Sequence, residues 1–131
     1  MKRSGEHVTI VAYARMTVLA LQAAEELAKE GISCEVVDLR SLAPLDEETI
    51  LASVRKTGRA VMVEECWRTC GLGGEIASRI YDNCFDILKA PVKRVSGLDV
   101  PMPYSRKIEK ICIPQAETIV QAVKDVMSGE Y

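Results

Sequence analysis

The sequence predicts an α/β domain, a three-layer α/β/α sandwich built around a mostly parallel sheet. Short apolar, β-branched runs alternate along the chain with longer segments of helical periodicity, and this pattern is typical of parallel strands joined by crossover helices. The chain has 131 residues, of which 48% are hydrophobic and 27% charged, as in ordinary globular proteins. No internal repeat or linker divides it, so residues 1–131 are expected to form a single domain.

Four strands are expected in the sheet. The first, Val8–Tyr13, is too continuously apolar for a one-faced strand and should be buried on both faces. The second and third are expected at Ser33–Leu39 and Arg59–Val63. The fourth, Pro91–Gly97, is less apolar and should therefore lie nearer an edge of the sheet.

Two helices are expected between the first three strands. Thr17 is the expected cap of a helix over Val18–Glu30, which Gly31 ends. Asp46 is the expected N-cap of the second helix, because acidic residues follow it in the first turn and favour the helix dipole. That helix should end near Thr57–Gly58.

Two further helices are expected in the second half of the chain. The helix after Gly74 has the clearest periodicity, with an apolar stripe at Ile76, Ala77, Ile80, Tyr81, Cys84, Phe85 and Leu88. A loop with two prolines, residues 100–104, should lead to a last helix that turns Ile119, Val120, Val123 and Val126 inward.

The segment from Val61 to Ile76 is the most informative part of the chain. It reads as a strand, a glycine-rich loop and a helix, the unit from which α/β domains build crevices at the carboxyl ends of strands. Its glycines, Gly71, Gly73 and Gly74, are expected to turn with positive φ and to let the backbone approach another surface closely.

The adjacent carboxylates Glu64 and Glu65 do not form a facing acid–base pair. Consecutive strand residues point to opposite faces, so one should lie in a crevice and the other in a surface or interface contact. The one histidine, His7, is expected at the far end of the sheet from Cys66 and Cys70, which speaks against a cysteine–histidine nucleophile. We expect no catalytic residue and no metal site in the chain, because the Cys66–Cys70 spacing matches no zinc or redox motif.

A phosphate site at the glycine loop is the less favoured interpretation. Arg15 and Arg68 could bind an anion there, but Glu75 in the first helical turn would repel it, and the loop lacks the dinucleotide and P-loop patterns. A structural turn or protein contact is favoured. Trp67 and Tyr104 beside Arg68 suit an interface hot spot, although a part-buried aromatic with a covering arginine explains them equally well.

Charge and cysteine usage exclude several classes of partner. The net charge of −2 favours neither nucleic acid nor an anionic membrane, and no apolar run approaches the roughly 20 residues that span a bilayer. Ser4 to His7 follow the basic start where a signal peptide would be apolar. The five cysteines are irregularly spaced, which suggests reduced thiols in a cytoplasmic protein.

Several segments together resemble the C-terminal domain of the transketolase superfamily. The resemblance is strongest to the β subunit of the thiamine-diphosphate-dependent E1 component of pyruvate, branched-chain 2-oxoacid and acetoin dehydrogenases. It spans nearly the whole chain in order. The segments that carry it are Val8-Thr-Ile-Val-Ala-Tyr13, Glu35-Val-Val-Asp-Leu-Arg-Ser-Leu-Ala-Pro-Leu-Asp46, Val63-Glu-Glu-Cys-Trp-Arg-Thr69 with Gly71 to Ile76, and Leu98-Asp-Val-Pro-Met-Pro-Tyr104.

The resemblance implies a three-layer sandwich with a five-stranded mixed sheet whose first strand is antiparallel. In the family that strand lies just before the segment that begins here at residues 1–5, so it is expected to be truncated, leaving an edge short or uncovered. The chain departs from the family pattern at Ala14, where glycine is common, and at Cys66 and Cys70.

The resemblance also implies an assembly role without catalysis. Thiamine diphosphate and magnesium would belong to other parts of the parent enzyme, and none would bind here. The expected partners are a second copy in a homodimer, the E1 α subunit and the remaining β-subunit domain, with the E2 core as a further candidate. The alternatives are a free-standing regulatory domain that binds a small ligand or nucleotide in the crevice between the first and third strands, and another transketolase-type enzyme.

Overall fold

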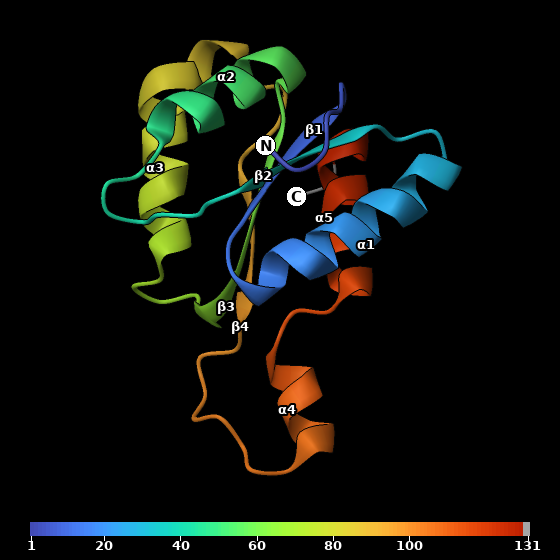
Figure 1. Ribbon diagram of the computed structural model, residues 1–131, viewed down its shortest axis with the longest axis vertical. Helices are drawn as coiled ribbons and strands as arrows, with labels where there is room; N and C mark the ends of the chain where they lie inside the picture. Colours follow the sequence, from blue (N-terminus) through green and yellow to red (C-terminus); the bar gives the residue numbers. More distant parts are fainter. Residues whose placement is uncertain (130–131) are drawn as a thin grey trace.

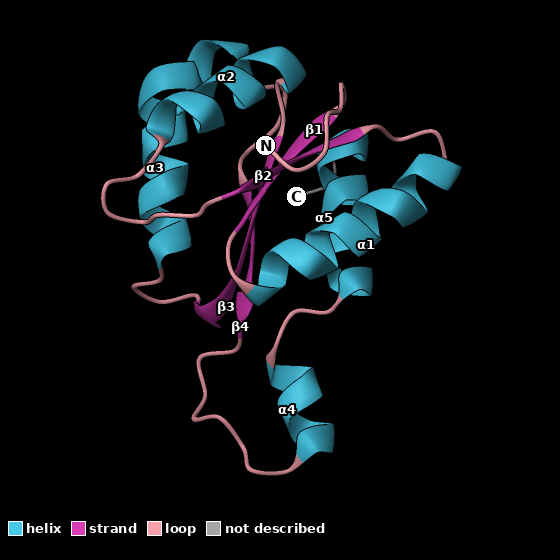
Figure 2. Cartoon of the chain, viewed as in Figure 1, coloured by secondary structure: helices cyan, strands magenta, loops and turns pink. Residues whose placement is uncertain are grey.

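The computed structural model describes residues 1–129 and shows a central parallel sheet with helices on both faces (Figures 1 and 2). The strands lie in the order β2-β1-β3-β4, and every neighbouring pair is parallel. Their bounds are β1 Val8–Ala12, β2 Cys34–Asp38, β3 Ala60–Trp67 and β4 Lys93–Gly97. The predicted α/β fold and the edge position of the fourth strand are thus confirmed.

Helices form the two outer layers. The helices are α1 Arg15–Lys29, α2 Glu47–Thr57, α3 Leu72–Cys84, α4 Arg106–Cys112 and α5 Ala116–Ser128. In Figure 1, α1 and α5 cover one face of the sheet, α2 and α3 cover the other, and α4 lies apart, beyond the carboxyl ends of β3 and β4. The carboxyl ends of the strands and α4 therefore share one end of the molecule.

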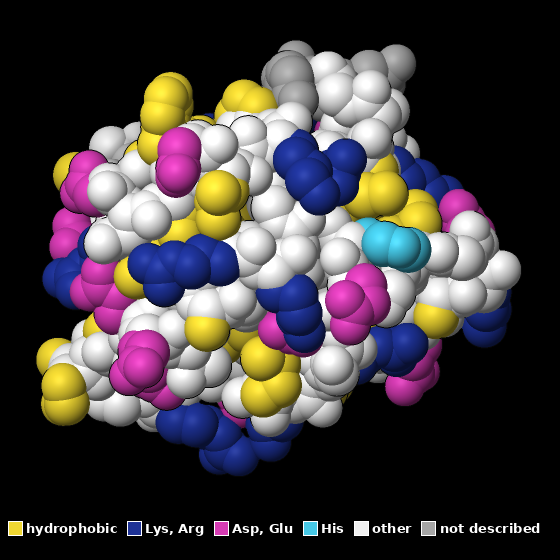
Figure 3. Space-filling model, turned by 90° about the horizontal axis from the view of Figure 1, so that it is seen from above, with side chains coloured by type: hydrophobic (Ala, Val, Ile, Leu, Met, Phe, Trp, Pro, Cys, Tyr) yellow, Lys and Arg dark blue, Asp and Glu magenta, His cyan; other side chains and the backbone are white. Residues whose placement is uncertain are grey.

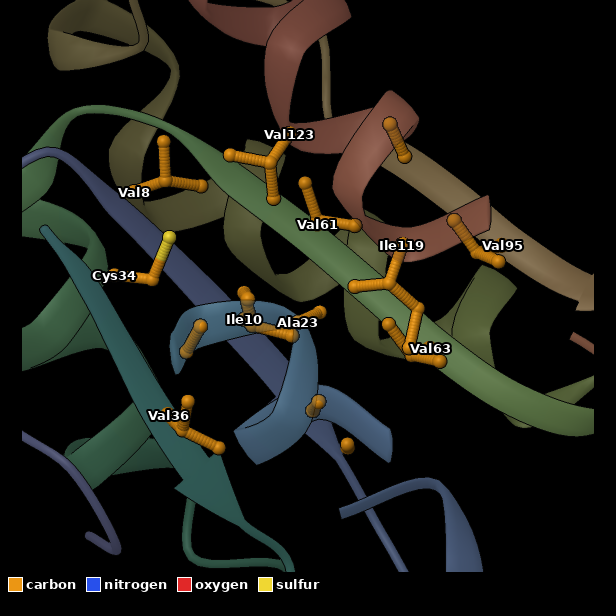
Figure 4. Packing of buried hydrophobic residues seen from close by; sticks show 14 of the residues in the cluster. Val8, Ile10, Ala23, Cys34, Val36, Val61, Val63, Val95, Ile119 and Val123 are labelled. Carbon is orange, nitrogen blue, oxygen red and sulfur yellow. The ribbon is translucent and has the colours of Figure 1, made fainter. Parts of the chain in front are cut away.

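The core consists of two apolar clusters, one on each face of the sheet. Alternate residues of each strand point to opposite faces, so Ile10 and Val61 pack under α1 and α5 while Val11 and Met62 pack under α2 and α3. Figure 4 shows the first cluster, in which Ile119 and Val123 of α5 lie against Val61 and Val63 of β3. Burial on both faces explains the continuous apolar runs at residues 10–12 of β1 and 60–63 of β3.

The start of α1 differs from the prediction. The helix begins at Arg15, and its N-cap residue is Ala14, which has φ 50° and makes no side-chain capping bond. Thr17, the expected cap, lies inside the helix, and its hydroxyl donates to a carboxylate oxygen of Asp38 at 3.0 Å. The side chain of Thr17 therefore ties α1 to the end of β2 instead of capping its own helix.

The predicted start and end of α2 are confirmed. The Thr49 backbone N–H donates to the Asp46 carboxylate at 3.1 Å, as an N-cap requires. Gly58 ends the helix in the left-handed conformation, with φ 71°, and its N–H donates to Val54. This is the usual glycine C-cap, in which a side chain would be strained.

Two predictions for the second half of the chain were wrong. The stripe assigned to one long helix breaks after Cys84, where Phe85–Ile87 form a 3₁₀ turn and Phe85 is 75% exposed. The segment after the proline loop contains an additional short helix, α4, before α5. Periodicity gave no signal for α4 because its apolar residues Ile108 and Ile111 face solvent instead of a core.

The edge of the sheet at β2 carries an antiparallel contact. Arg3 forms an antiparallel bridge with Val36, and the Lys2 N–H donates to the Val36 carbonyl at 2.8 Å. Gly5 packs so closely on β2 that an added Cβ would lie 2.2 Å from the Cys34 backbone. The expected antiparallel strand is therefore represented, in the described residues, by this short pairing.

Charges of both signs are mixed on the surface near the amino ends of the strands. Figure 3 shows Lys and Arg side chains interspersed with Asp and Glu on the face seen from above, with His7 among them. His7 is exposed, and its Nδ1 accepts a hydrogen bond from the Ser33 N–H at 3.0 Å. Among the described residues no helix is both long and apolar enough to cross a bilayer.

Candidate functional site

The candidate site is organised by Glu64, a carboxylate with no solvent exposure in the middle of β3. Strand β3 extends to Trp67, four residues beyond the predicted end at Val63, and the pleat turns Glu64 inward and Glu65 outward. Glu65 lies 3.9 Å from Arg15 in an exposed ion pair. The two carboxylates therefore have separate environments.

Four donors surround the Glu64 carboxylate. Oε1 accepts from the Arg94 guanidinium and from the Ser96 hydroxyl, both at 2.9 Å. Oε2 accepts from the Gly73 N–H at 2.8 Å and from the Cys66 thiol at 3.0 Å. A single buried carboxylate thus joins β3, β4 and the first turn of α3, since Arg94 and Ser96 belong to β4.

These contacts hold Glu64 in its charged form. Burial alone would raise its pKa, but the hydrogen bonds from Cys66, Arg94, Gly73 and Ser96 outweigh burial, and the net pKa lies below the ordinary value. The Cys66 thiol shows the opposite effect: burial, followed by its bond to Glu64, raises its pKa. Cys66 therefore remains a protonated donor and a poor nucleophile at neutral pH.

The loop glycines serve close approach, and the expectation of positive φ was wrong for all three. Gly71 has φ −71°, and positive φ in this loop falls on Cys70, at 57°. An added Cβ would lie 2.4 Å from the Trp67 carbonyl at Gly71 and 2.5 Å from Glu64 Oε1 at Gly73. At Gly74 it would lie at an ordinary 3.4 Å from Arg94.

The same geometry fills the place where a phosphate would bind. An anion at a helix N-terminus needs free N–H groups, and at α3 the Gly73 N–H already binds the chain's own Glu64 carboxylate. The crevice between β1 and β3 is also spanned, because the Tyr13 hydroxyl lies 3.4 Å from Cys66 Sγ and Arg15 pairs with Glu65. Both features favour a structural loop over an anion site.

The described residues do not fit thiamine diphosphate or its magnesium ion. No group of three or more histidine, cysteine or acidic side chains among them could hold a metal ion. The one helix N-terminus that follows a glycine loop presents Glu64 where a diphosphate would need a positive environment.

Trp67, Arg68 and Tyr104 lie at the end of the molecule that carries α4. The Trp67 indole N–H donates to the Val100 carbonyl at 3.0 Å, and the ring remains 52% exposed. Arg68 and Arg94 bind each other's backbone carbonyls, at 3.0 and 2.8 Å. Tyr104 is fully exposed on the loop before α4. The Glu64–Arg94 pair thus supports the end of β3, where Trp67 lies, and the loop that begins at Arg68.

The structure separates the predicted residues into two groups. Glu64, Trp67, Arg68 and the three glycines lie around the end of β3, whereas Arg15 lies beside α4 in a different hollow with Arg106 and Lys110. Sequence reasoning missed Arg94 and Ser96, the β4 partners of Glu64. The only signal for them was that an inward-facing acid at the end of a strand needs a buried donor.

Sequence reasoning also missed the exposed apolar surface next to Trp67. We call residues 98–112 the arm, which comprises the loop after β4 and α4. Together with Trp67, the arm exposes seven large hydrophobic side chains, which are Trp67, Leu98, Val100, Met102, Tyr104, Ile108 and Ile111. Such a concentration on one end of a domain is typical of an interaction surface.

The transketolase C-terminal domain model matches residues 1–119. The chain belongs to this family. A rice protein named pyruvate dehydrogenase E1 component subunit beta-2, mitochondrial, is 51% identical over 124 residues, which cover 95% of this chain and 33% of the relative. The corresponding E1 subunit beta of Rickettsia bellii is 47% identical, with 95% and 38% covered. This transketolase C-terminal domain thus spans about a third of the length of the curated relatives it matches.

A solved structure supports the same fold. It is described as a split-gene transketolase, an inactive beta4 tetramer, and its TM-score to this transketolase C-terminal domain is 0.83 at 34% identity. The alignment covers 98% of this chain and 41% of that one. The resemblance inferred from the sequence segments is confirmed.

The expectation of a cytoplasmic protein was wrong. The rice relative is named mitochondrial, and so are relatives from Arabidopsis, Dictyostelium, pea and Caenorhabditis elegans. The five cysteines are free thiols in the structure, but free thiols argue only against an oxidising compartment. They do not separate one reducing compartment from another.

Proposed function

We propose that this chain is the C-terminal assembly domain of a thiamine-diphosphate-dependent E1 β subunit that acts on pyruvate or a related 2-oxoacid. The names of the similar proteins support the parent enzyme. The observation that carries the assembly role is the exposed apolar surface of Trp67 and the arm. The domain itself contributes no catalytic group.

The interface has a rigid base and a projecting part. Glu64 fixes Arg94, which in turn binds the Arg68 carbonyl next to Trp67. The arm is attached to this base by the Trp67 bond to Val100 and by Asp99, whose carboxylate accepts from the Thr69 N–H at 3.2 Å. Aromatic and arginine side chains on a preformed base are typical of interface hot spots.

The partners proposed for this surface are a second copy, the E1 α subunit, the rest of the β subunit and the E2 core. Self-association has the most direct support, because the similar split-gene transketolase chain is described as a beta4 tetramer. Thiamine diphosphate and magnesium are proposed for the parent enzyme only.

The test is the self-association of the chain in solution, measured by sedimentation equilibrium. Trp67→Ala and Tyr104→Ala should each weaken self-association at least about tenfold, corresponding to about 1.4 kcal/mol. Phe85→Ala is the matched control, since Phe85 is an exposed aromatic side chain that lies outside the surface formed by Trp67 and the arm. Unchanged association in both the Trp67 and the Tyr104 variant would refute the proposal. The same variants can be tested for co-purification with an E1 α subunit.

A regulatory ligand-binding domain is the second candidate, and the structure supports it less. Its proposed crevice between β1 and β3 is spanned by the Tyr13–Cys66 and Arg15–Glu65 contacts. It predicts that phosphate or a nucleotide raises the melting temperature and that Arg15→Ala or Arg68→Ala abolishes the effect. The proposed assembly role also predicts that calorimetry detects no tight binding of thiamine diphosphate to this chain. Tight binding would overturn the proposal that the cofactor belongs to other parts of the parent enzyme.

A further inference from the structure

A groove runs along the outer edge of β4. Its volume is about 470 Å³, and one wall consists of the consecutive residues 93–99. The opposite wall is one stripe of α5, made of Thr118, Gln121, Ala122 and Asp125. Arg68 closes the end next to the arm.

The groove faces the hydrogen-bonding edge of the strand. Side chains of a strand alternate between the two faces of a sheet, so a hollow that touches seven consecutive residues must follow the edge itself. In the described chain β4 is the last strand of the sheet on this side. The backbone groups of β4 that point away from β3 therefore point into the groove.

Two hydrogen bonds show which backbone groups these are. The Arg94 carbonyl accepts from the Arg68 side chain, and the Leu98 N–H donates to the Cys112 carbonyl, so both residues bond outside the sheet. Backbone groups of a parallel strand alternate in direction, which places Ser96 on the same side. Among the described residues, no hydrogen bond to a group outside the strands is found for the Arg94 N–H or for either backbone group of Ser96.

The opposite edge of the same sheet is already paired. On the β2 side, Lys2 and Arg3 lie along Val36 and exchange backbone hydrogen bonds with it. An extended segment is thus an occupant that this sheet accepts at an edge. The β4 edge offers a shorter row, formed by the Arg94 N–H and the two backbone groups of Ser96, between the bonds to Arg68 and Cys112.

The charges at the groove select the chemistry of the occupant. Lys93 is neutralised by Asp125 at 3.0 Å, and Arg94 is neutralised by Glu64. Arg68 forms no ion pair within 4.0 Å in the described part of the chain. Its guanidinium donates to the Arg94 carbonyl, and the carboxylate of Asp99, on the same wall, interacts with its charge only from a greater distance. A carboxylate on the occupant would complement Arg68, and small or apolar side chains would fit beside Ala122 and Leu98.

We propose that the β4 groove binds an extended acidic segment of a partner polypeptide, which adds to the sheet as a further strand. Strand addition of this kind derives affinity from backbone bonds and specificity from the flanking side chains. The five residues of β4 span about 16 Å at roughly 3.3 Å per residue, enough to pair with a segment of similar length. The groove shares Leu98 and Asp99 with the arm, but its α5 wall lies outside the arm, so substitutions on that wall test the groove separately.

The experiment uses labelled heptapeptides of alternating threonine and valine, with one aspartate placed at each position in turn. Binding to the 131-residue chain is measured by fluorescence anisotropy, and hydrogen exchange of the Arg94 and Ser96 amides is followed by NMR. We expect at least one acidic peptide to bind and to slow exchange of both amides about tenfold or more. The same peptide with asparagine in place of its aspartate should bind several-fold more weakly. In the Arg68→Gln variant the two peptides should bind with equal affinity.

A bulky residue introduced into the groove should block peptide binding, and the same residue introduced just outside the groove is the matched control. Thr118→Trp places an indole on the α5 wall and should weaken peptide binding at least about tenfold, while Glu117→Trp, one residue away and outside the groove, should not. Gln121→Trp serves as a second blocking variant if Thr118→Trp does not fold. Self-association through the arm should be unchanged in all of them.

Three results would overturn the proposal. The first is that no peptide of the set protects Arg94 and Ser96. The second is binding that survives both blocking variants. The third is protection of the two amides in the absence of peptide together with concentration-dependent dimerisation, which would assign the groove to a second copy of the chain.

Discussion

The Glu64 carboxylate lies 2.9 Å from the Arg94 guanidinium, and this pair joins two neighbouring strands beneath the first turn of α3. Glu64 is fully buried, and the Arg94 side chain is partly buried, with 17% of its surface exposed. Charges removed from water in this way are stable only when each is matched, and here Ser96, Gly73 and Cys66 complete the shell of the carboxylate. The base of the proposed interface therefore depends on one ion pair.

Replacing Glu64 by glutamine should destabilise the fold by about 3 kcal/mol, because it leaves the partly buried Arg94 charge without its partner and removes the charged acceptor of four hydrogen bonds. Urea denaturation at neutral pH measures the change. Glu65→Gln is the control, since its ion pair with Arg15 is exposed and should contribute less than about 1 kcal/mol. Equal losses in the two variants would show that the Glu64 shell does not stabilise the loop.

Stability should fall in acid through the same carboxylate. The pKa of Glu64 is lower in the folded state than its ordinary 4.5, so its contribution is complete above that value and is lost as the pH falls through the folded pKa. Glu35 is lowered as well; burial opposes the shift, but bonds from Lys56, Ser53 and Gly5 outweigh it. Protonation of either carboxylate should therefore lower the free energy of unfolding as the pH falls below 4.5.

The Glu64→Gln variant isolates one of these contributions. Unfolding free energies of the wild type and of the variant, measured by urea titration between about pH 7 and pH 3, should converge as the pH falls, because the variant has no carboxylate to protonate. Curves that stay parallel over this range would contradict the assignment of a lowered pKa to Glu64.

Replacement of glycine by alanine is expected to have opposite effects on stability at two adjacent positions, Gly73 and Gly74. Gly73→Ala should cost about 2 kcal/mol, since its Cβ would lie 2.5 Å from the buried Glu64 oxygen. Gly74→Ala meets only an ordinary contact at 3.4 Å and should stabilise α3 by up to about 1 kcal/mol. Thermal denaturation of the two variants is the measurement, and destabilisation of both to the same extent would contradict the geometry.

The sequence predicted the fold because the fold depends on local patterns. Burial on both faces made residues 10–12 of β1 and 60–63 of β3 continuously apolar, and capping at Asp46 and Gly58 marked the ends of α2. The helix α4 was missed because its apolar side chains face solvent, so its seven residues carry no amphipathic pattern toward the core. The start of α1 was misplaced because Thr17 bonds to Asp38, a contact between distant segments.

The site was predictable only in part, for the same reason. The alternation of a strand was sufficient to separate Glu64 from Glu65, and the glycines indicated a close approach. What they approach is the Glu64 carboxylate, whose partner Arg94 lies 30 residues further along the chain. Nothing local to either residue indicates that pairing, and the edge groove of β4 likewise exists only once α5 lies beside the strand.

In residues 1–129, the two positions with positive φ that are not glycine coincide with departures from the family pattern noted in the sequence. Ala14 has φ 50° and Cys70 has φ 57°, and a side chain in this region costs about 1–2 kcal/mol relative to ordinary backbone. Ala14→Gly and Cys70→Gly should therefore each stabilise the fold. The gain should be about 0.5–1 kcal/mol, since glycine also loses more backbone entropy on folding.

Urea denaturation of the two single variants and of the double variant measures these gains. The reverse substitution Gly31→Ala is the control for backbone strain alone, because Gly31 has φ 82° and an added Cβ would meet no atom within 4 Å. It should cost about 1 kcal/mol, and the cost contains no steric clash. If Gly31→Ala destabilises as expected while Cys70→Gly gives no gain, Cys70 contributes a side-chain interaction that compensates its backbone strain. The strain argument would then fail for the loop.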